Sequence, residues 1–271
     1  MKQLQRYFLI LIAAVFVSGM LASCEEIVDA EGLPYEEKLV IHSILYADSA
    51  HNYVRISRTL PVNETFDTSR AYIRDASGSI NDGTVSFPLE YIGAGGVYRV
   101  TGLRPVPGRD YHLNVSWNGL NATASTSIPT GVSLDSISLV EDTLYEGMRQ
   151  FRVMTIATLP APYSASFEVF ALSDDWVNGS WTNRLYDHRD AENDGKLYVR
   201  ENLYQSRGDG DVERLVALAY FMAPGYKEYY ETGGGRSDEF GNPVPVRWNV
   251  EGDAIGIFFG CTKVEKVQEL D

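Results

Sequence analysis

From Leu39 onward, apolar residues occur in short runs or at every second position, and turn-forming residues separate these segments. Side chains of a β-strand alternate between two faces, so this spacing predicts strands rather than helices. The predicted strands are 39–45, 52–59, 71–74, 84–92, 96–100, 111–117, 122–128, 134–140, 151–159, 166–172, 196–203, 213–222 and 254–262. Turns are expected at Ser77-Gly78 and Asn81-Asp82-Gly83, and residues 174–194 read as irregular. The chain is therefore expected to be mainly β.

One segment, Pro224–Thr232, reads as a helix, because a proline stands near its start and three glycines follow it. Tyr226, Tyr229 and Tyr230 have the i, i+3, i+4 spacing that places side chains on one helical face. We interpret that face as a packing surface rather than as a platform for a ligand.

The segment 107–115 has the pattern of the last hairpin of an immunoglobulin-like sandwich, with Tyr111 three residues after Gly108. In that pattern the tyrosine ring packs on the core and its hydroxyl group ties down the preceding corner. Asn118-Gly119 predicts a tight hairpin turn. We place a boundary at residues 129–131, and expect an N-terminal immunoglobulin-like β-sandwich at 38–130 and a second β-rich domain with one short helix at 131–271.

The N-terminus reads as a signal peptide, residues 1–23, because Lys2 and Arg6 precede an uncharged apolar run at 7–21. About 15 apolar residues are short for a membrane-spanning helix. Leu21-Ala22-Ser23-Cys24 resembles the bacterial lipobox, which implies diacylation of Cys24 and anchoring of the protein in a membrane. The alternative is an ordinary cleaved signal followed by an unmodified cysteine.

Residues 24–37 are expected to be an acidic tether, since they contain six acidic residues, and Gly32 and Pro34 interrupt regular structure. Acids directly after the cysteine resemble the export signal that sends some lipoproteins of Bacteroidota to the outer face of the outer membrane. A solvated spacer that happens to be acidic is the alternative.

The formal net charge of −14 argues against nucleic acid as a partner, because phosphates require a basic surface. The chain has two cysteines, Cys24 and Cys261. With Cys24 acylated, no disulfide can form, and Cys261, close to Phe258 and Phe259, is interpreted as a small buried hydrophobic residue.

The segment 190–201 matches the spacing of an EF-hand calcium loop. Its candidate calcium ligands are Asp190, Glu192, Asp194 and Glu201, with Gly195 at the turn position. However, residues 197–203 read as a strand, where an EF-hand requires a helix. The alternative is an Asn-Asp-Gly turn that opens a strand, and no other cofactor is predicted.

Trp176, Trp181 and Tyr186 are candidate ligand-binding residues, because flat rings among carboxylates and amides can stack on sugars or grip peptides. The alternative is a long loop that its own aromatic residues pin to the body of the domain. No motif of a known catalytic site is found, and no catalytic residue is predicted. For a hydrolase, Asp174 with Asp175 or Asp187 with Asp190 could pair as acid and base, although adjacent carboxylates on an acidic surface are usually only solvated.

The segments 241–246 and 249–258 resemble the closing signature of the domain of unknown function 4249, a group of Bacteroidota lipoproteins. The helix with tyrosines, the lipobox and the hairpin at 107–115 also fit this family, in which a second glycine commonly stands at the position of Asp253. We interpret Asn249, Gly252 and Gly256 as residues that set the chain path, since Asn and Gly tolerate positive φ.

The resemblance implies an outer-membrane location, often beside a TonB-dependent transporter, and implies no activity. We therefore expect a lipid-anchored, cell-surface protein that is not an enzyme and that serves a transporter as a binding or accessory subunit. The alternatives are a structural surface protein, such as an adhesin or fibre subunit, and a glycan or peptide hydrolase.

Overall fold

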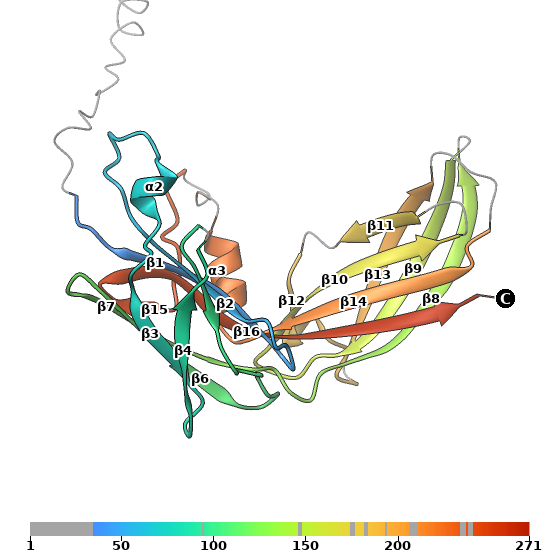
Figure 1. The fold of residues 1–271 in the computed structure, drawn as a ribbon. Helices are drawn as coiled ribbons and strands as arrows, with labels where there is room; N and C mark the ends of the chain where they lie inside the picture. The colour runs from blue at the N-terminus through green and yellow to red at the C-terminus, as the bar shows by residue number, and fades with distance from the viewer. Residues whose placement is uncertain are drawn as a thin grey trace, which may run out of the picture. The chain divides into compact units, whose positions relative to one another are not determined.

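A computed structural model describes residues 35–93, 95–145, 148–173, 177–181, 184–192, 194–205, 211–233, 237 and 241–270. Within these residues the protein is mainly β, as predicted (Figure 1). The strands are β1 (Leu39–Tyr46), β2 (Tyr53–Arg58), β3 (Ser77–Asn81), β4 (Ser86–Tyr91), β5 (Val97–Val100), β6 (Asp110–Trp117), β7 (Leu120–Ser127), β8 (Ser133–Tyr145), β9 (Met148–Thr158), β10 (Ser164–Leu172), β11 (Val177–Trp181), β12 (Tyr186–Asp187), β13 (Lys196–Gln205), β14 (Arg214–Met222), β15 (Val250–Gly252) and β16 (Ala254–Glu269). The helical elements are α2 (Thr68–Ala71), η2 (His188–Asp190) and α3 (Tyr226–Thr232). In the described part of the chain, no helix has both the length and the apolar character needed to span a bilayer.

The chain divides into two compact units, residues 1–36 with 61–65 and residues 37–60 with 66–271. In the first unit, the described residues 61–65 contain a turn in which the Glu64 amide donates to the Pro61 carbonyl oxygen at 3.0 Å. All strands and helices named above lie in the second unit.

The strands of the second unit form two sheets. The larger has the order β11-β10-β14-β16-β1-β2-β5-β4-β3-β6-β7-β15, with β12 also beside β10, and the smaller has the order β13-β9-β8. Only β1 and β16 run parallel among the described pairs. Strand β4 joins two parts of the larger sheet, because it pairs with β3 through Ser86–Pro88 and with β5 through Leu89–Tyr91.

The first hydrophobic core lies between strands β1, β2 and β5 on one side and β3, β6 and β7 on the other. Alternate residues of both groups are buried, as the period of two predicts. They include Leu39, Ile41, Val54, Ile56, Tyr98 and Val100 from the first group and Ile80, Tyr111, Leu113, Val115 and Ala124 from the second. This region is therefore two layers of strands around one core, and its immunoglobulin-like topology stays a prediction.

Tyr111 makes the contacts that its position in the sequence predicts. Its ring is 1% exposed in the first core, and its hydroxyl oxygen accepts a hydrogen bond from the backbone amide of Val106 at 2.8 Å. The hydroxyl group therefore holds the corner before β6, because it gives a partner to an amide that the turn leaves without a strand neighbour.

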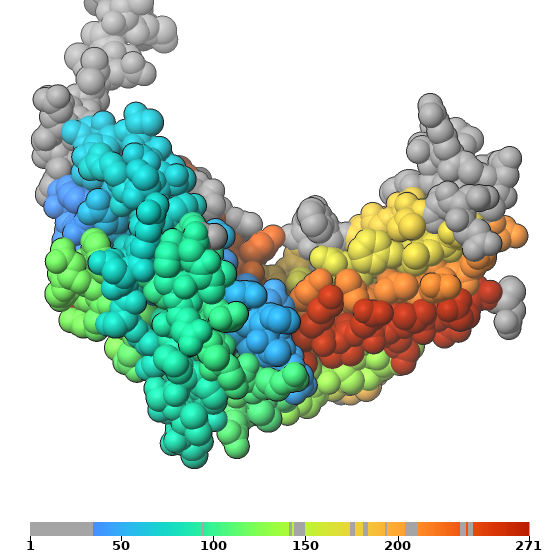
Figure 2. All heavy atoms as spheres, viewed as in Figure 1, coloured from blue at the N-terminus to red at the C-terminus, as the bar shows by residue number. Residues whose placement is uncertain are grey.

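Strand β16 contributes to both cores. Residues 254–261 pair with β1, and residues 261–269 pair with β14, so that β14 and β16 lie side by side in orange and red in Figure 2. From β16 the first core takes Ala254 and Phe258, beside Val250 of β15, while Val264 packs on the second core, formed mainly by β9, β10, β13 and β14. The predicted division at residue 130 stays a prediction, although the C-terminal strand supplies residues to the first core.

Three sequence-based predictions about local structure are wrong. Residues 71–74 do not form a strand: Ala71 ends the short helix α2, whose cap Asp67 accepts a hydrogen bond from the Ser69 amide at 2.8 Å, and Tyr72 makes only an isolated antiparallel bridge to Ser57. Ser77-Gly78 is part of β3 rather than a turn. A Cβ atom on Gly78 would lie 2.5 Å from the Asn114 carbonyl oxygen of β6, so glycine permits close approach of the strands here.

The third wrong prediction is the irregular character of residues 174–194, where β11 and β12 pair with β10. Strand β16 also runs to Glu269, seven residues beyond the predicted end at 262. Strand β11 is at the edge of the larger sheet, and residues 262–269 of β16 pair with β14 but not with β1, so pairing with a neighbouring strand decides the structure of both segments more than apolar alternation does.

Gly252 and Gly256 set the chain path, as predicted. Gly252 has φ +92° and Gly256 has φ +127°, which side chains of L-residues rarely permit. A Cβ atom on Gly256 would lie 1.9 Å from the carbonyl oxygen of Ile41 in β1. The parallel pairing of β1 with β16 therefore requires glycine at this position.

Helix α3 packs on the sheet through two of its three tyrosines. Tyr226 meets Phe259 of β16 edge-on with ring centroids 5.3 Å apart, and Tyr229 lies 6.3 Å from the same ring. Trp248 covers Tyr229 at 5.8 Å, while Tyr230 is 39% exposed. The predicted packing role is confirmed for Tyr226 and Tyr229.

Candidate functional site

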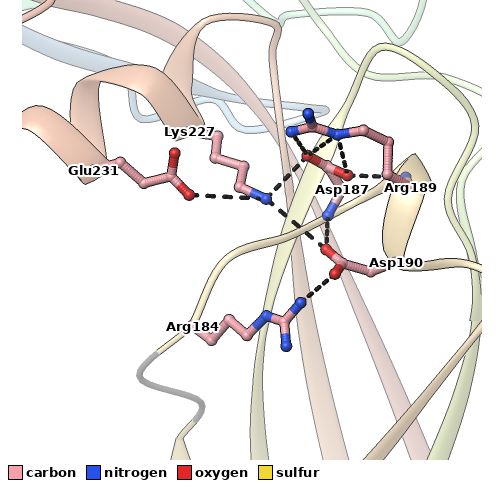
Figure 3. Close-up of polar contacts among 6 residues, drawn as sticks. All are labelled: Arg184, Asp187, Arg189, Asp190, Lys227 and Glu231. Carbon is pink, nitrogen blue, oxygen red and sulfur yellow. Dashed lines mark hydrogen bonds and ion pairs between the residues drawn. The ribbon is translucent and has the colours of Figure 1, made fainter.

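Six charged side chains from three neighbouring segments lie together (Figure 3). This charged cluster consists of Arg184, Asp187, Arg189, Asp190, Lys227 and Glu231. The strand β12 and the turn η2 supply one side, and α3 supplies Lys227 and Glu231. The segments meet because β12 and β14 both pair with β10, and α3 follows β14.

Asp187 is the most buried member of the charged cluster, with 7% of its surface exposed. Its carboxylate accepts hydrogen bonds from Arg189 through Nε at 3.0 Å and Nη2 at 2.5 Å, and from Lys227 Nζ at 2.9 Å. The hydrogen bonds from Arg189, followed by that from Lys227, lower the pKa of Asp187 well below its usual range, although burial opposes this. Asp187 therefore remains ionised in the folded protein at neutral pH.

Asp190 completes a capping box with Asp187. The Asp187 carboxylate accepts from the Arg189 amide at 2.8 Å, and the Asp190 carboxylate accepts from the Asp187 amide at 2.8 Å. Arg184 also donates to Asp190. These reciprocal bonds fix the turn η2, so both carboxylates have defined positions.

Lys227 is the cation that ties α3 to β12. Its side chain is 16% exposed, and its Nζ atom lies 2.9 Å from Asp187 but 3.8 Å from both Asp190 and Glu231. Only the first of these distances is within the range of a hydrogen bond. Three carboxylates therefore attract the ammonium group electrostatically, but only Asp187 accepts a hydrogen bond from it.

A pocket of about 280 Å³ opens beside the charged cluster. Its walls are Pro162, Tyr163, Ser164, Asp187, His188, Arg189, Pro224, Gly225, Lys227 and Glu228. Ser164 is 3% exposed, and among the described residues its hydroxyl oxygen has no hydrogen-bond partner. A buried hydroxyl group without a partner is unfavourable, so Ser164 is a polar group that a ligand in this pocket could satisfy.

A family model for the domain of unknown function DUF4249 matches residues 25–267. The chain belongs to the DUF4249 family. A comparison with curated proteins finds no match.

Of the three aromatic residues of this DUF4249 protein that were predicted to bind a ligand, only the side chain of Tyr186 is among the described parts of the structure. Trp176 lies outside the described residues, and Trp181 ends β11 with a side chain that is also outside the described part. Tyr186 packs edge-on against Phe167 at 5.8 Å, and Arg184 lies over its ring at 5.0 Å. Tyr186 therefore packs in the way that the alternative interpretation predicts, and its role in ligand binding stays a prediction.

The four calcium candidates are not arranged around one point. Asp190 pairs with Arg184 and the Asp187 amide, while Asp194 accepts from the Lys196 amide at 2.9 Å. Glu201 lies in β13 and accepts from Ser180 at 3.4 Å, and Glu192 is exposed. Among the described residues, no group of three or more His, Cys, Asp or Glu side chains is placed to hold a metal ion.

The segment instead forms the turn that the alternative predicts. Gly195 has φ +74°, its amide donates to the Glu192 carbonyl oxygen at 2.9 Å, and β13 begins at Lys196. The helix that would place a twelfth-position ligand over an EF-hand loop is replaced by a strand, because residues 196–205 pair with β9. Calcium binding stays a prediction without support from this geometry.

Cys261 is buried, as predicted, with 1% of its surface exposed. Burial raises the pKa of its thiol group to about 12, so this thiol is neutral in the folded protein. Cys24, Asp174 and Asp175 lie outside the described residues.

Sequence reasoning identified Asp187 and Asp190 but missed Arg189, Lys227 and Ser164. The aspartates stood out because they are close in sequence, whereas Lys227 is 40 residues from Asp187. A lysine on the predicted helix is common, and Ser164 stands two residues before the strand predicted at 166–172, so no local pattern marked either residue.

Proposed function

We propose that the protein is an outer-membrane lipoprotein that binds rather than catalyses, as an accessory subunit of a TonB-dependent transporter. The observation that carries this proposal is Cys24, which closes a lipobox-like segment after the apolar run 7–21. Acyl chains on this cysteine would bury methylene groups at about 0.8 kcal/mol each and hold the β-rich body at a bilayer.

The charged cluster supports binding over hydrolysis. A general base works best with a pKa near the working pH, and the hydrogen bonds from Arg189 and Lys227 lower the pKa of Asp187 well below its usual range. Asp190 is engaged by Arg184 and by the Asp187 amide. Asp187 therefore has little capacity to take up a proton at neutral pH, and both carboxylates are engaged in hydrogen bonds that fix the turn η2.

Mass spectrometry of the N-terminal peptide tests the anchor. We expect the peptide that begins at Cys24 to carry acyl chains, and the full-length protein to fractionate with outer membranes. Cys24→Ser is the matched control, and it should leave the membrane fraction while its β-sheet circular dichroism is unchanged. An unmodified N-terminal peptide contradicts the proposal.

Affinity purification of the anchored protein from mildly solubilised outer membranes tests the partner. A TonB-dependent transporter, identified by its peptides, should be enriched with the native chain relative to Cys24→Ser. Isolation of the anchored protein without a transporter would refute the accessory role and leave the anchor intact.

A further inference from the structure

We propose that the pocket beside the charged cluster binds a small amino acid, whose carboxylate meets Ser164, Lys227 and Arg189 and whose ammonium group meets Glu228. This inference depends on the described pocket alone, and it holds whether or not the protein serves a transporter.

The pocket has hydrogen-bond donors that the charged cluster does not use. Lys227 has three N–H donors, of which one bonds Asp187 at 2.9 Å, while its other two carboxylate neighbours lie at 3.8 Å. Arg189 directs Nε and Nη2 to Asp187, which leaves the Nη1 donors of a 75% exposed side chain for another acceptor. A ligand that brings acceptor oxygens matches these groups.

The hydroxyl group of Ser164 adds a buried donor in the wall of the pocket. It is shielded from solvent and has no partner among the described residues, whereas the Asp187 carboxylate on the opposite strand is saturated by Arg189 and Lys227. Ser164 can therefore donate to a ligand carboxylate without breaking an existing bond. Hydrogen bonds to charged groups are stronger than neutral ones, so an ionised acceptor is favoured over a neutral carbonyl group.

Glu228 makes a zwitterion a better match than a simple anion. It is an exposed carboxylate in the wall of the same pocket, and it repels a ligand that carries only negative charge. A ligand with an ammonium group a few ångströms from its carboxylate pairs with Glu228 and with Lys227 at once. The wall of this one pocket therefore offers partners for both charges of an amino acid.

The size and the apolar walls limit the ligand. A volume of about 280 Å³ lies just below the range of about 300–1,000 Å³ of typical small-molecule sites. Pro162, Tyr163 and Pro224 offer apolar surface for a short side chain. A small amino acid fits this space better than an oligosaccharide or a long peptide.

Calorimetric titration of the full-length protein in detergent with L-alanine, propionate and D-glucose tests the proposal. L-alanine and propionate differ by the ammonium group, so alanine should bind at least about tenfold more tightly, and glucose should not bind. Glu228→Gln should remove the preference for alanine over propionate. If alanine does not bind, or if glucose binds instead, the proposal is wrong.

Ser164→Ala distinguishes a ligand contact from a structural one. Because the hydroxyl group has no partner among the described residues, its removal should leave the melting temperature unchanged or slightly higher, while the affinity for alanine falls about tenfold. The matched control is Ser166→Ala, two residues along the same strand and outside the pocket. Equal alanine affinities of Ser164→Ala and the control would overturn the assignment.

Discussion

The side-chain amide of Asn249 makes two hydrogen bonds with the backbone of Phe258, nine residues away. Its Nδ2 atom donates to the Phe258 carbonyl oxygen at 2.6 Å, and its Oδ1 atom accepts from the Phe258 amide at 2.8 Å. The Asn249 side chain thus makes the two hydrogen bonds with Phe258 of β16 that the backbone of a neighbouring strand would otherwise make. It sets the chain path as predicted, but through its side chain, since its own φ is not positive.

Asn249→Ala should therefore destabilise the protein by about 2–4 kcal/mol, because it leaves a partly buried amide and carbonyl group without partners. Asn249→Asp should also destabilise it, since a carboxylate cannot donate to the Phe258 carbonyl oxygen. Urea unfolding measures the loss, with Asn114→Ala at an exposed position of β6 as control. Equal midpoints for Asn249→Ala and the control would contradict this role.

Gly256→Ala should cost more than about 4 kcal/mol or prevent folding. The new Cβ atom would lie 1.9 Å from the Ile41 carbonyl oxygen, and φ +127° is unfavourable for alanine. Gly119→Ala separates the two causes, because Gly119 has φ +84° but no heavy atom within 4 Å of the added Cβ. The control should cost about 1–2 kcal/mol, and comparable losses for both variants would show that the contact with β1 is unimportant.

Lowering the pH should reduce the stability of the folded protein, because Asp187 becomes protonated. The folded pKa of Asp187 is lower than its usual value near 3.9, so its contribution is complete above about pH 5 and is lost as the pH falls toward the folded pKa. Asp187→Asn should cost about 1–3 kcal/mol at pH 7 and should flatten the dependence of the melting temperature on pH between about 2 and 4.

Melting curves across this pH range measure the effect, with Asp110→Asn, exposed at the start of β6, as the matched control. The control should keep the native slope. If Asp187→Asn also keeps it, the ion pairs with Arg189 and Lys227 do not contribute to acid stability.

Cys261 should be unreactive in the folded protein. The residue is 1% exposed, and burial raises the pKa of its thiol to about 12. At pH 8 the reagent therefore cannot reach the sulfur, and the reactive thiolate is a very small fraction of the thiol. In full-length Cys24→Ala, where Cys261 is the only thiol, Ellman's reagent should react only after urea is added. Adding Ala50→Cys at an exposed position supplies a thiol that should react at once. Fast labelling of Cys261 in the folded Cys24→Ala variant, which lacks this added cysteine, would disprove its burial.

The sequence by itself determined most of the strands, the helix near Tyr226, the contact of Tyr111 with its corner and the role of Gly252 and Gly256. These features depend on the periods of about 2 residues in a strand and about 3.6 in a helix, or on a local backbone conformation, and residues close in the sequence are enough to reveal them. The motif at the C-terminus also identified the family, which the match over residues 25–267 shows.

Only the tertiary structure decided the pocket and the two ends of β16. Lys227 reaches Asp187 because β10 pairs with both β12 and β14, and the second half of β16 is held by β14 rather than by its own alternation. Pairings between distant segments follow from strand register and the burial of a common core. A local pattern therefore suggested a calcium loop at Asp190, whereas the folded chain uses Asp190 to cap a turn.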